Sequence, residues 1–92
     1  MIMMNDKSTE VINPKFKIHV HDCRSTIGDE IRKIREKKGY SQEHLAHMMK
    51  ISRTTISKIE NGKFNFSIDY LSKFSWFLDF NITISPFNDE SY

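Results

Sequence analysis

The sequence predicts a compact, mainly α-helical domain of four or five helices with a short β-strand at each end. Three features support this prediction. Apolar residues recur at helical spacing through the middle of the chain, small polar residues precede the apolar stretches as helix caps do, and apolar residues alternate with polar ones near both ends. A chain of 92 residues suits one domain and excludes a two-domain enzyme with a cleft between lobes.

The chain divides into a central helical domain with a strand and a tail on each side. The tails show no hydrophobic period, so we expect them to be flexible. In chain order the expected segments are an N-terminal tail (1–14), a strand (15–22), the helical domain (25–79), a second strand that joins two copies (80–86) and a C-terminal tail (87–92).

Both strand predictions depend on short runs in which apolar and polar residues alternate. The apolar members are Phe16, Ile18 and Val20 in the first run, and Phe80, Ile82 and Ile84 in the second. An isolated two-stranded ribbon is only marginally stable, so the strands must pack on something. The sequence does not decide whether they pair within one chain or across a dimer.

The first helix is expected to begin at Ser25 or Thr26 and to end at Gly39. Its apolar residues fall at i, i+4 and i+7 and are Ile27, Ile31 and Ile34. Glycine is common just after a helix because it adopts the left-handed conformation without strain.

Three shorter helices follow, each preceded by a residue that can cap it. They are Gln42 to Met49 after Ser41, Arg53 to Asn61 after Ser52, and a fourth helix after Asn65 or Ser67. The apolar stripe of the fourth helix consists of Ile68, Leu71, Phe74 and Leu78, with further aromatic residues, Phe66, Tyr70, Trp76 and Phe77, beside or opposite it. So much aromatic surface favours dimerisation over a ligand pocket.

Basic residues are concentrated in the helical region. Residues 24–63 contain ten basic and five acidic residues, a formal charge of +5, whereas the rest contains four basic and seven acidic residues, a charge of −3. The formal charge of the whole chain is +2. A basic centre indicates a polyanionic partner, although a solvated charged face is an alternative.

Composition also limits the compartment. The single cysteine, Cys23, cannot form an intramolecular disulfide, which fits a reducing bacterial cytoplasm. No apolar run is long enough to span a membrane, and the first ten residues do not have the pattern of a signal peptide, so we expect neither a membrane partner nor secretion.

Two short helices joined by a tight turn are typical of the helix-turn-helix motif. The helix from Gln42 would support a recognition helix that starts at Arg53. With Ile56 and Ile59 facing inward, the outward residues are Arg53, Thr54, Ser57 and Lys58. Arginine can bind guanine through two hydrogen bonds, and threonine can contact the thymine methyl group.

The segment 27–78 resembles the Xre/Cro-type helix-turn-helix domain of phage repressors, a lambda-repressor-like fold. The resemblance lies in Ile31-Arg32-x-x-Arg35-Glu36-x-x-Gly39-Tyr40-Ser41-Gln42-Glu43-x-Leu45-Ala46 and in the run from Ile51 to Gly62. It implies a transcription regulator that binds double-stranded operator DNA as a homodimer, without a cofactor.

The resemblance also implies roles for individual residues. Gln42 would bind a phosphate and brace the recognition helix, Arg53, Thr54 and Lys58 would read bases, and Asn61 and Lys63 would contact phosphates. Arg35 and Glu60 would form a structural ion pair rather than contact DNA. The full predicted DNA-binding set is Gln42, Ser52, Arg53, Thr54, Ser57, Lys58, Asn61 and Lys63.

This chain departs from the family pattern at two places. Lys50 stands in the turn where the family often has glycine, and a left-handed backbone there would cost a lysine about 1 kcal/mol. The predicted strand 80–86 replaces the family's fifth helix and resembles antitoxins of the HipB type. The alternative to a repressor is therefore an antitoxin that binds a partner toxin and autoregulates its operon.

An enzyme is a distant third, since no nucleophile–base pair or phosphate-binding glycine loop is evident, and no catalytic residue is predicted. Two histidine clusters have too few ligands for a metal site, and we predict none. They are His44 with His47, and His19 with His21 and Cys23. The operator, the regulated genes and the choice between repression and activation cannot be inferred from the sequence.

Overall fold

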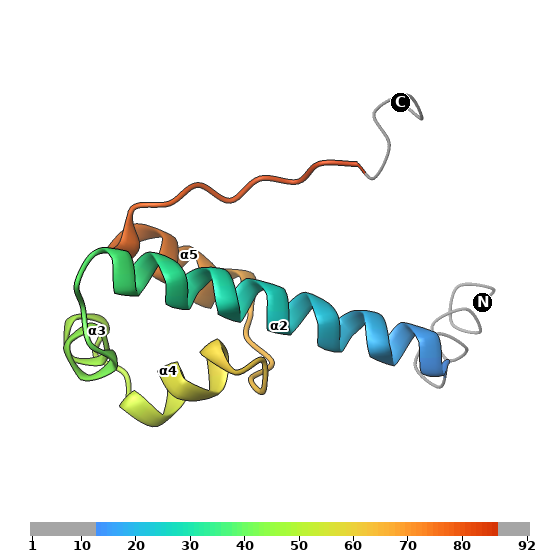
Figure 1. The fold of residues 1–92 in the computed structure, drawn as a ribbon, viewed down its shortest axis with the longest axis horizontal. Coiled ribbons are helices and arrows are strands. Elements are labelled where there is room, and N and C mark those ends of the chain that lie inside the picture. The colour runs from blue at the N-terminus through green and yellow to red at the C-terminus, as the bar shows by residue number, and fades with distance from the viewer. Residues whose placement is uncertain (1–12, 87–92) are drawn as a thin grey trace.

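The structure is a computed structural model that describes residues 13–86, and four helices form in that range (Figure 1). They are α2 (Pro14–Lys37), α3 (Gln42–Met49), α4 (Arg53–Glu60) and α5 (Ile68–Leu78). The mainly α-helical architecture is as predicted. The expected tails fall outside the described residues, except for positions 13 and 14.

The strand predicted over residues 15–22 is wrong, because these residues form the first turns of α2. Asn13 caps this helix, and its side chain accepts a hydrogen bond of 2.9 Å from the backbone N–H of Lys15. Pro14 occupies the first helical position, where its missing N–H breaks no helical hydrogen bond. The helix therefore starts at Asn13 and Pro14 rather than at Ser25 or Thr26.

The alternation that suggested this strand covers only three apolar residues and is part of a longer helical pattern. Phe16 and Val20 are the first members of a stripe at i, i+4, i+7 and i+11 that continues with Cys23 and Ile27. Ile18 falls off this stripe and is 60% exposed. A stripe sustained over several turns outweighs a short period of two.

The strand predicted for residues 80–86 is also wrong, since no strand occurs anywhere in residues 13–86. This segment extends from the end of α5 back along α2 (Figure 1). Phe80 packs against the core, whereas Ile84 is 96% exposed. A strand needs a neighbour to complete its backbone hydrogen bonds, and none is present in the described part of this chain.

All four helices contribute to one hydrophobic core. Its buried members are Ile31, Leu45, Ala46, Met49, Ile56, Ile59, Phe74 and Leu78. Half-buried residues that include Ile27, Ile34, Tyr40 and Leu71 surround them. The long helix α2 therefore has a C-terminal half fixed in the core and an N-terminal end that projects past the α4–α5 loop (Figure 1).

The helix α2 approaches the C-terminal end of α4 closely at Gly28. A Cβ atom added to Gly28 would lie 2.1 Å from the carbonyl oxygen of Ile59 and 2.9 Å from that of Glu60. No side chain fits in this space, so the crossing requires glycine even though glycine is unfavourable inside a helix. This contact sets how α2 lies on α4.

The caps place the shorter helices as the sequence predicts. Ser41, Ser52 and Ser67 each accept a hydrogen bond from the backbone N–H three residues later. The choice between Asn65 and Ser67 is therefore settled in favour of Ser67. Gly39, with φ +80°, follows the end of α2.

The turn between α3 and α4 contains a strained residue. Lys50 ends α3 in the left-handed region, with φ 58° and ψ 44°. Ile51 then donates its backbone N–H to the carbonyl of Ala46 at 3.0 Å. The backbone at Lys50 thus has the conformation that glycine adopts freely.

No helix among the described residues is long and apolar enough to cross a membrane.

Candidate nucleic-acid interface

The helices α3 and α4 pack together through the core and leave one face of α4 exposed. Ile56 and Ile59 are fully buried on the inner side of α4. Residues at positions i, i+1, i+4, i+5 and i+8 from the start of α4 fall on the opposite side. They are Arg53, Thr54, Ser57, Lys58 and Asn61; Ser57 is half-buried and the other four are exposed.

The predicted site residues therefore form one surface. Gln42 lies at the start of α3, Ser52 caps α4, and Lys63 lies in the loop after α4. Lys58 and Lys63 are both exposed. The backbone N–H of Lys63 donates a hydrogen bond to the carbonyl of Lys58 at 2.8 Å, which fixes the loop after α4 to the helix. This surface is polar and basic, as a DNA-binding surface must be.

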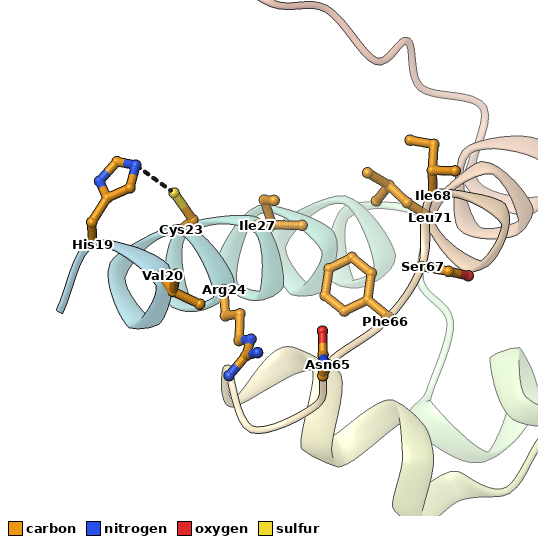
Figure 2. Close-up of a pocket in the computed structure, with 10 residues that line it drawn as sticks. All are labelled: His19, Val20, Cys23, Arg24, Ile27, Asn65, Phe66, Ser67, Ile68 and Leu71. Carbon is orange, nitrogen blue, oxygen red and sulfur yellow. Dashed lines mark hydrogen bonds between the residues drawn. The ribbon is translucent and has the colours of Figure 1, made fainter. Parts of the chain in front are cut away.

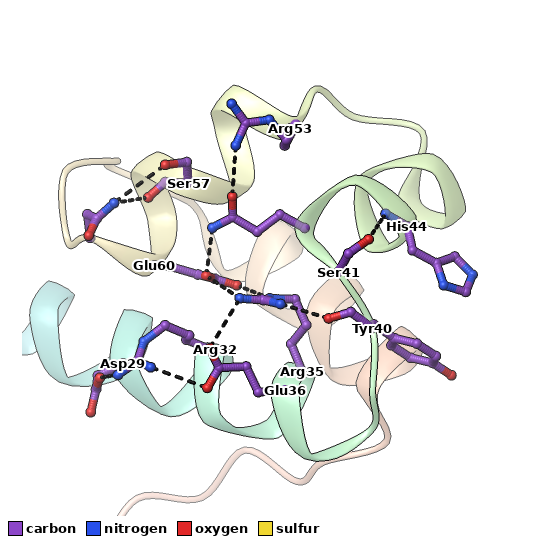
Figure 3. Close-up of polar contacts among 12 residues, drawn as sticks. Asp29, Arg32, Arg35, Glu36, Tyr40, Ser41, His44, Arg53, Ser57 and Glu60 are labelled. Carbon is purple, nitrogen blue, oxygen red and sulfur yellow. Dashed lines mark hydrogen bonds and ion pairs between the residues drawn. The ribbon is translucent and has the colours of Figure 1, made fainter.

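A buried ion pair lies behind this surface and joins α2 to α4. The Nε and Nη2 atoms of Arg35 donate to the two carboxylate oxygens of Glu60 at 2.6 and 3.0 Å (Figure 3). Arg35 also donates from Nη1 to the backbone carbonyl of Tyr40 at 2.7 Å. Both charged side chains are buried, with 8% and 2% of their surfaces exposed.

The pair has the geometry that a buried charge requires. Two parallel hydrogen bonds join the guanidinium to the carboxylate, and the Tyr40 carbonyl accepts a third. The pKa of Arg35 is raised, mainly by its hydrogen bond to Glu60, so the guanidinium stays charged. These contacts match the structural role that the sequence suggested for both residues.

Gln42 connects this ion pair to the exposed surface. Its Nε2 donates to Glu60 Oε1 at 2.9 Å, and its Oε1 accepts from Arg53 Nη1 at 3.0 Å. The amide orientation is fixed by its neighbours, because the carboxylate can only accept and the guanidinium can only donate. A continuous chain of hydrogen bonds therefore extends from Arg35 through Glu60 and Gln42 to Arg53.

Two further predicted contact residues, besides Gln42 and Arg53, already make hydrogen bonds within the protein. Asn61 donates from Nδ2 to the backbone carbonyl of Ser57 at 2.8 Å, where it caps the end of α4. Ser52 accepts from Thr55 N–H at 3.1 Å and lies 2.8 Å from the Thr55 hydroxyl. Their side chains have a structural role whether or not they also meet DNA.

Sequence reasoning missed three features of the site. Gly28 was not identified as a contact point, although a glycine in the middle of a helix often marks close packing. The Arg35 bond to the Tyr40 carbonyl is a local contact just after α2, and the Gln42 bond to Arg53 depends on how α3 and α4 meet. The family resemblance implied that Gln42 braces the recognition helix but did not identify Arg53 as its partner.

The histidine clusters do not form a metal site among the described residues. No group of three or more histidine, cysteine, aspartate or glutamate side chains comes together in residues 13–86. His19 Nε2 lies 3.6 Å from the sulfur of Cys23. The His44 ring packs edge-on against Tyr40, with the ring centroids 5.1 Å apart.

Comparison with known proteins matches this geometry to a family. Residues 31–84 match a family model described as helix-turn-helix. Control protein C.MunI from a Mycoplasma species is 40% identical over 57 residues, which cover 61% of this chain and 77% of that protein. The crystal structure of the restriction-modification controller protein C.AhdI from Aeromonas hydrophila gives a TM-score of 0.62 and 30% identity, over 66% of this chain and 88% of that chain.

Proposed function

This chain belongs to the Xre/Cro-type helix-turn-helix family of DNA-binding transcriptional regulators, not to a family of enzymes, and we propose that it acts as a homodimer in which α4 of each copy enters a major groove. A bound dimer would cover two half-sites about one helical turn apart and repress a promoter that overlaps them. The similarity to the restriction-modification controller protein C.AhdI suggests that the regulated genes belong to a restriction-modification system.

The observation that carries this proposal is the bond between Gln42 and Arg53. Gln42 holds one Nη atom of Arg53 at 3.0 Å and leaves the rest of the guanidinium free at the exposed start of α4. A guanidinium held this way would present its remaining N–H groups to the O6 and N7 atoms of guanine. Thr54 and Lys58 are exposed on the same face and would read neighbouring bases.

The phosphate contacts of the proposal lie on both sides of α4. Gln42, Ser52 and the free amides at the start of α3 would meet one backbone, since helix N-termini bind anions. Lys63 in the loop after α4 would meet the other. Asn61 and Ser57 complete the surface, although Asn61 first caps α4.

The dimer is proposed from the exposed face of α5. Trp76 is 77% exposed and lies on the side of α5 opposite the buried Phe74 and Leu78. Ile68, which was expected in the inward stripe of this helix, is 64% exposed two turns earlier. Exposed large apolar side chains are typical of a protein interface. Trp76 is the only tryptophan of the sequence, so its fluorescence reports directly on this face.

The antitoxin alternative depended on the extra strands. Neither strand forms in residues 13–86, so this alternative has lost its main support.

Binding to DNA from upstream of the chain's own gene tests the proposal. We expect that duplex to bind about 10³-fold more tightly than a scrambled duplex at the same salt concentration. Arg53→Ala should remove about 1–3 kcal/mol of this discrimination. Arg32→Ala is the matched control, because Arg32 lies on α2 and pairs with Asp29 and Glu36.

The outcomes of this test are separable. Equal and weak binding of both duplexes, seen only at low salt, would contradict the proposed function. Sedimentation over a range of protein concentrations tests the dimer separately. Under conditions in which the wild-type chain sediments as a dimer, the Trp76→Lys variant should sediment as a monomer. A wild-type chain that stays monomeric at high concentration would contradict the dimer.

A further inference from the structure

The N-terminal part of α2 lies outside the family match and projects from the domain. The match begins at residue 31, whereas the helix begins at Pro14. Residues 14–28 rise about 21 Å along the helix axis. In Figure 1 this end of α2 extends past the loop that follows α4, so it reaches beyond the edge of the proposed DNA-binding surface.

One face of the projecting segment continues the face that packs on α4. Gly28 and Arg35 define that face, because Gly28 lies against the backbone of α4 and Arg35 binds Glu60. Counting back from Gly28 by 4, 7 and 11 residues stays on the same side of a helix. These positions are Arg24, His21 and Lys17.

The close-up of this region agrees with the helical count. Figure 2 shows Arg24 directed from α2 toward the α4–α5 loop, near Asn65. His19 and Cys23 lie on the opposite side of the helix in the same view. Arg24 is half-buried, while Lys17 and His21 are exposed. The basic line thus begins at the loop that holds Lys63 and continues outward along α2.

The projecting segment carries more basic than acidic side chains. Asp22 is the only acidic residue between Pro14 and Gly28, and its position lies about 100° around the helix from that of His21. Its carboxylate lies 3.8 Å from His21 Nδ1, and 70% of the Asp22 side chain is exposed. The face that continues the α4 side therefore carries two permanent positive charges, with one carboxylate at its edge beside His21.

We propose that this line, Lys17, His21 and Arg24, contacts the phosphate backbone of the duplex beyond the base pairs that α4 reads. The inference rests on the proposed function, since it needs α4 in the major groove. Its support is the continuity of the line with the proposed interface and its charge. Lysine and arginine contacts with phosphate position a protein on DNA without reading its sequence.

Replacement of Lys17 and Arg24 by glutamine tests this proposal. Each lost phosphate contact should lower the slope of log affinity against log salt by about 0.9 and the affinity at 150 mM salt by about five-fold. Because both protomers of the proposed dimer carry each change, we expect K17Q to show two such losses per bound dimer, and K17Q with R24Q to show four. Both the native upstream duplex and the scrambled duplex should weaken equally, because phosphates carry no sequence information.

Lys15→Gln is the matched control. Lys15 is exposed on the same helix, but it lies two positions before Lys17 and so on a different side. Lys15→Gln removes the same charge at nearly the same position along α2. We expect its affinity and salt slope to stay within two-fold of wild type, and circular dichroism should show that all variants are folded.

The results distinguish this inference from the proposed function. If wild type prefers the native duplex but K17Q and K15Q behave alike, the contact along α2 is refuted while the proposed function stands. If wild type shows no preference, the proposed function itself has failed. If K17Q with R24Q changes the oligomeric state and not the salt slope, the surface binds protein, and the inference is wrong.

Discussion

Gln42 donates a hydrogen bond of 2.9 Å to Glu60, so a residue at the proposed DNA surface is held by a buried carboxylate. The same carboxylate binds Arg35 on α2. One buried group therefore orients the support helix, the recognition helix and the first helix of the described domain. Fold stability and the proposed DNA recognition therefore both depend on Glu60.

Breaking the buried ion pair should destabilise the protein strongly. We expect Glu60→Leu or Arg35→Met to lower the free energy of unfolding by about 3–5 kcal/mol, because either change leaves the buried charge of the other residue uncompensated. Urea denaturation measures this loss. The double variant Arg35→Met with Glu60→Leu should be more stable than either single variant, and additive losses would show that the two residues act independently.

Gly28→Ala should destabilise the fold by about 1–3 kcal/mol, since its Cβ would clash with backbone that cannot move aside easily. The nearest atom is a carbonyl oxygen of α4, only 2.1 Å from the position of that Cβ. Thr26→Ala, at an exposed position two residues earlier, provides the control. Equal thermal stability of Gly28→Ala and wild type would contradict the close approach of α2 and α4.

Lys50→Gly should stabilise the protein. With lysine, the left-handed backbone destabilises the folded state by about 1–2 kcal/mol. Glycine removes this strain, but it gives the unfolded chain more conformational entropy, which offsets about 0.5–1 kcal/mol of the gain in stability. We expect a net gain of up to about 1 kcal/mol in thermal or urea unfolding, with DNA affinity unchanged. Lys50→Val should instead destabilise, because a branched side chain fits this backbone poorly. A loss of stability in Lys50→Gly would show that the lysine side chain contributes more than the strain costs.

Asp29 should make stability depend on pH in the acid range. Its pKa is lowered, chiefly by the side-chain hydrogen bond from Arg32 and then by that from Lys33. A carboxyl whose folded pKa is depressed stabilises the fold above its unfolded pKa, and this contribution is lost as pH falls below about 4 through the folded pKa. Asp29→Asn should therefore melt at a lower temperature than wild type at pH 7, and the difference should close near pH 2. A difference that persists at pH 2 would rule out this carboxylate as its cause.

The core and the caps were predictable because local physics determines them. Ser41 and Ser52 cap α3 and α4, and Ile56 and Ile59 face inward, as side-chain chemistry and helical spacing predict. The proposed contact residues then fall on the outer face of α4. Their exposure follows from the same period of 3.6 residues.

The ends of the domain were not predictable by the same rules. Residues 15–22 follow both a short alternating pattern and a longer helical one, and the Asn13–Pro14 cap decides between them. The pattern from Phe80 to Ile84 is alternating, but a strand depends on a partner that a single chain does not reveal. Likewise, the bond between Gln42 and Arg53 joins residues on different helices, and its existence depends on tertiary packing.

The crossing at Gly28 gives α2 the mechanics of a lever. A helix of this length is stiff, and its C-terminal half is fixed in the core while its N-terminal end projects freely. The 14 residue steps from Gly28 to Pro14 span about 21 Å, so a tilt of about 10° at Gly28 would move the N-terminal end by about 4 Å. The absence of a side chain at Gly28, near the middle of the helix, therefore determines the direction of the N-terminal end of α2.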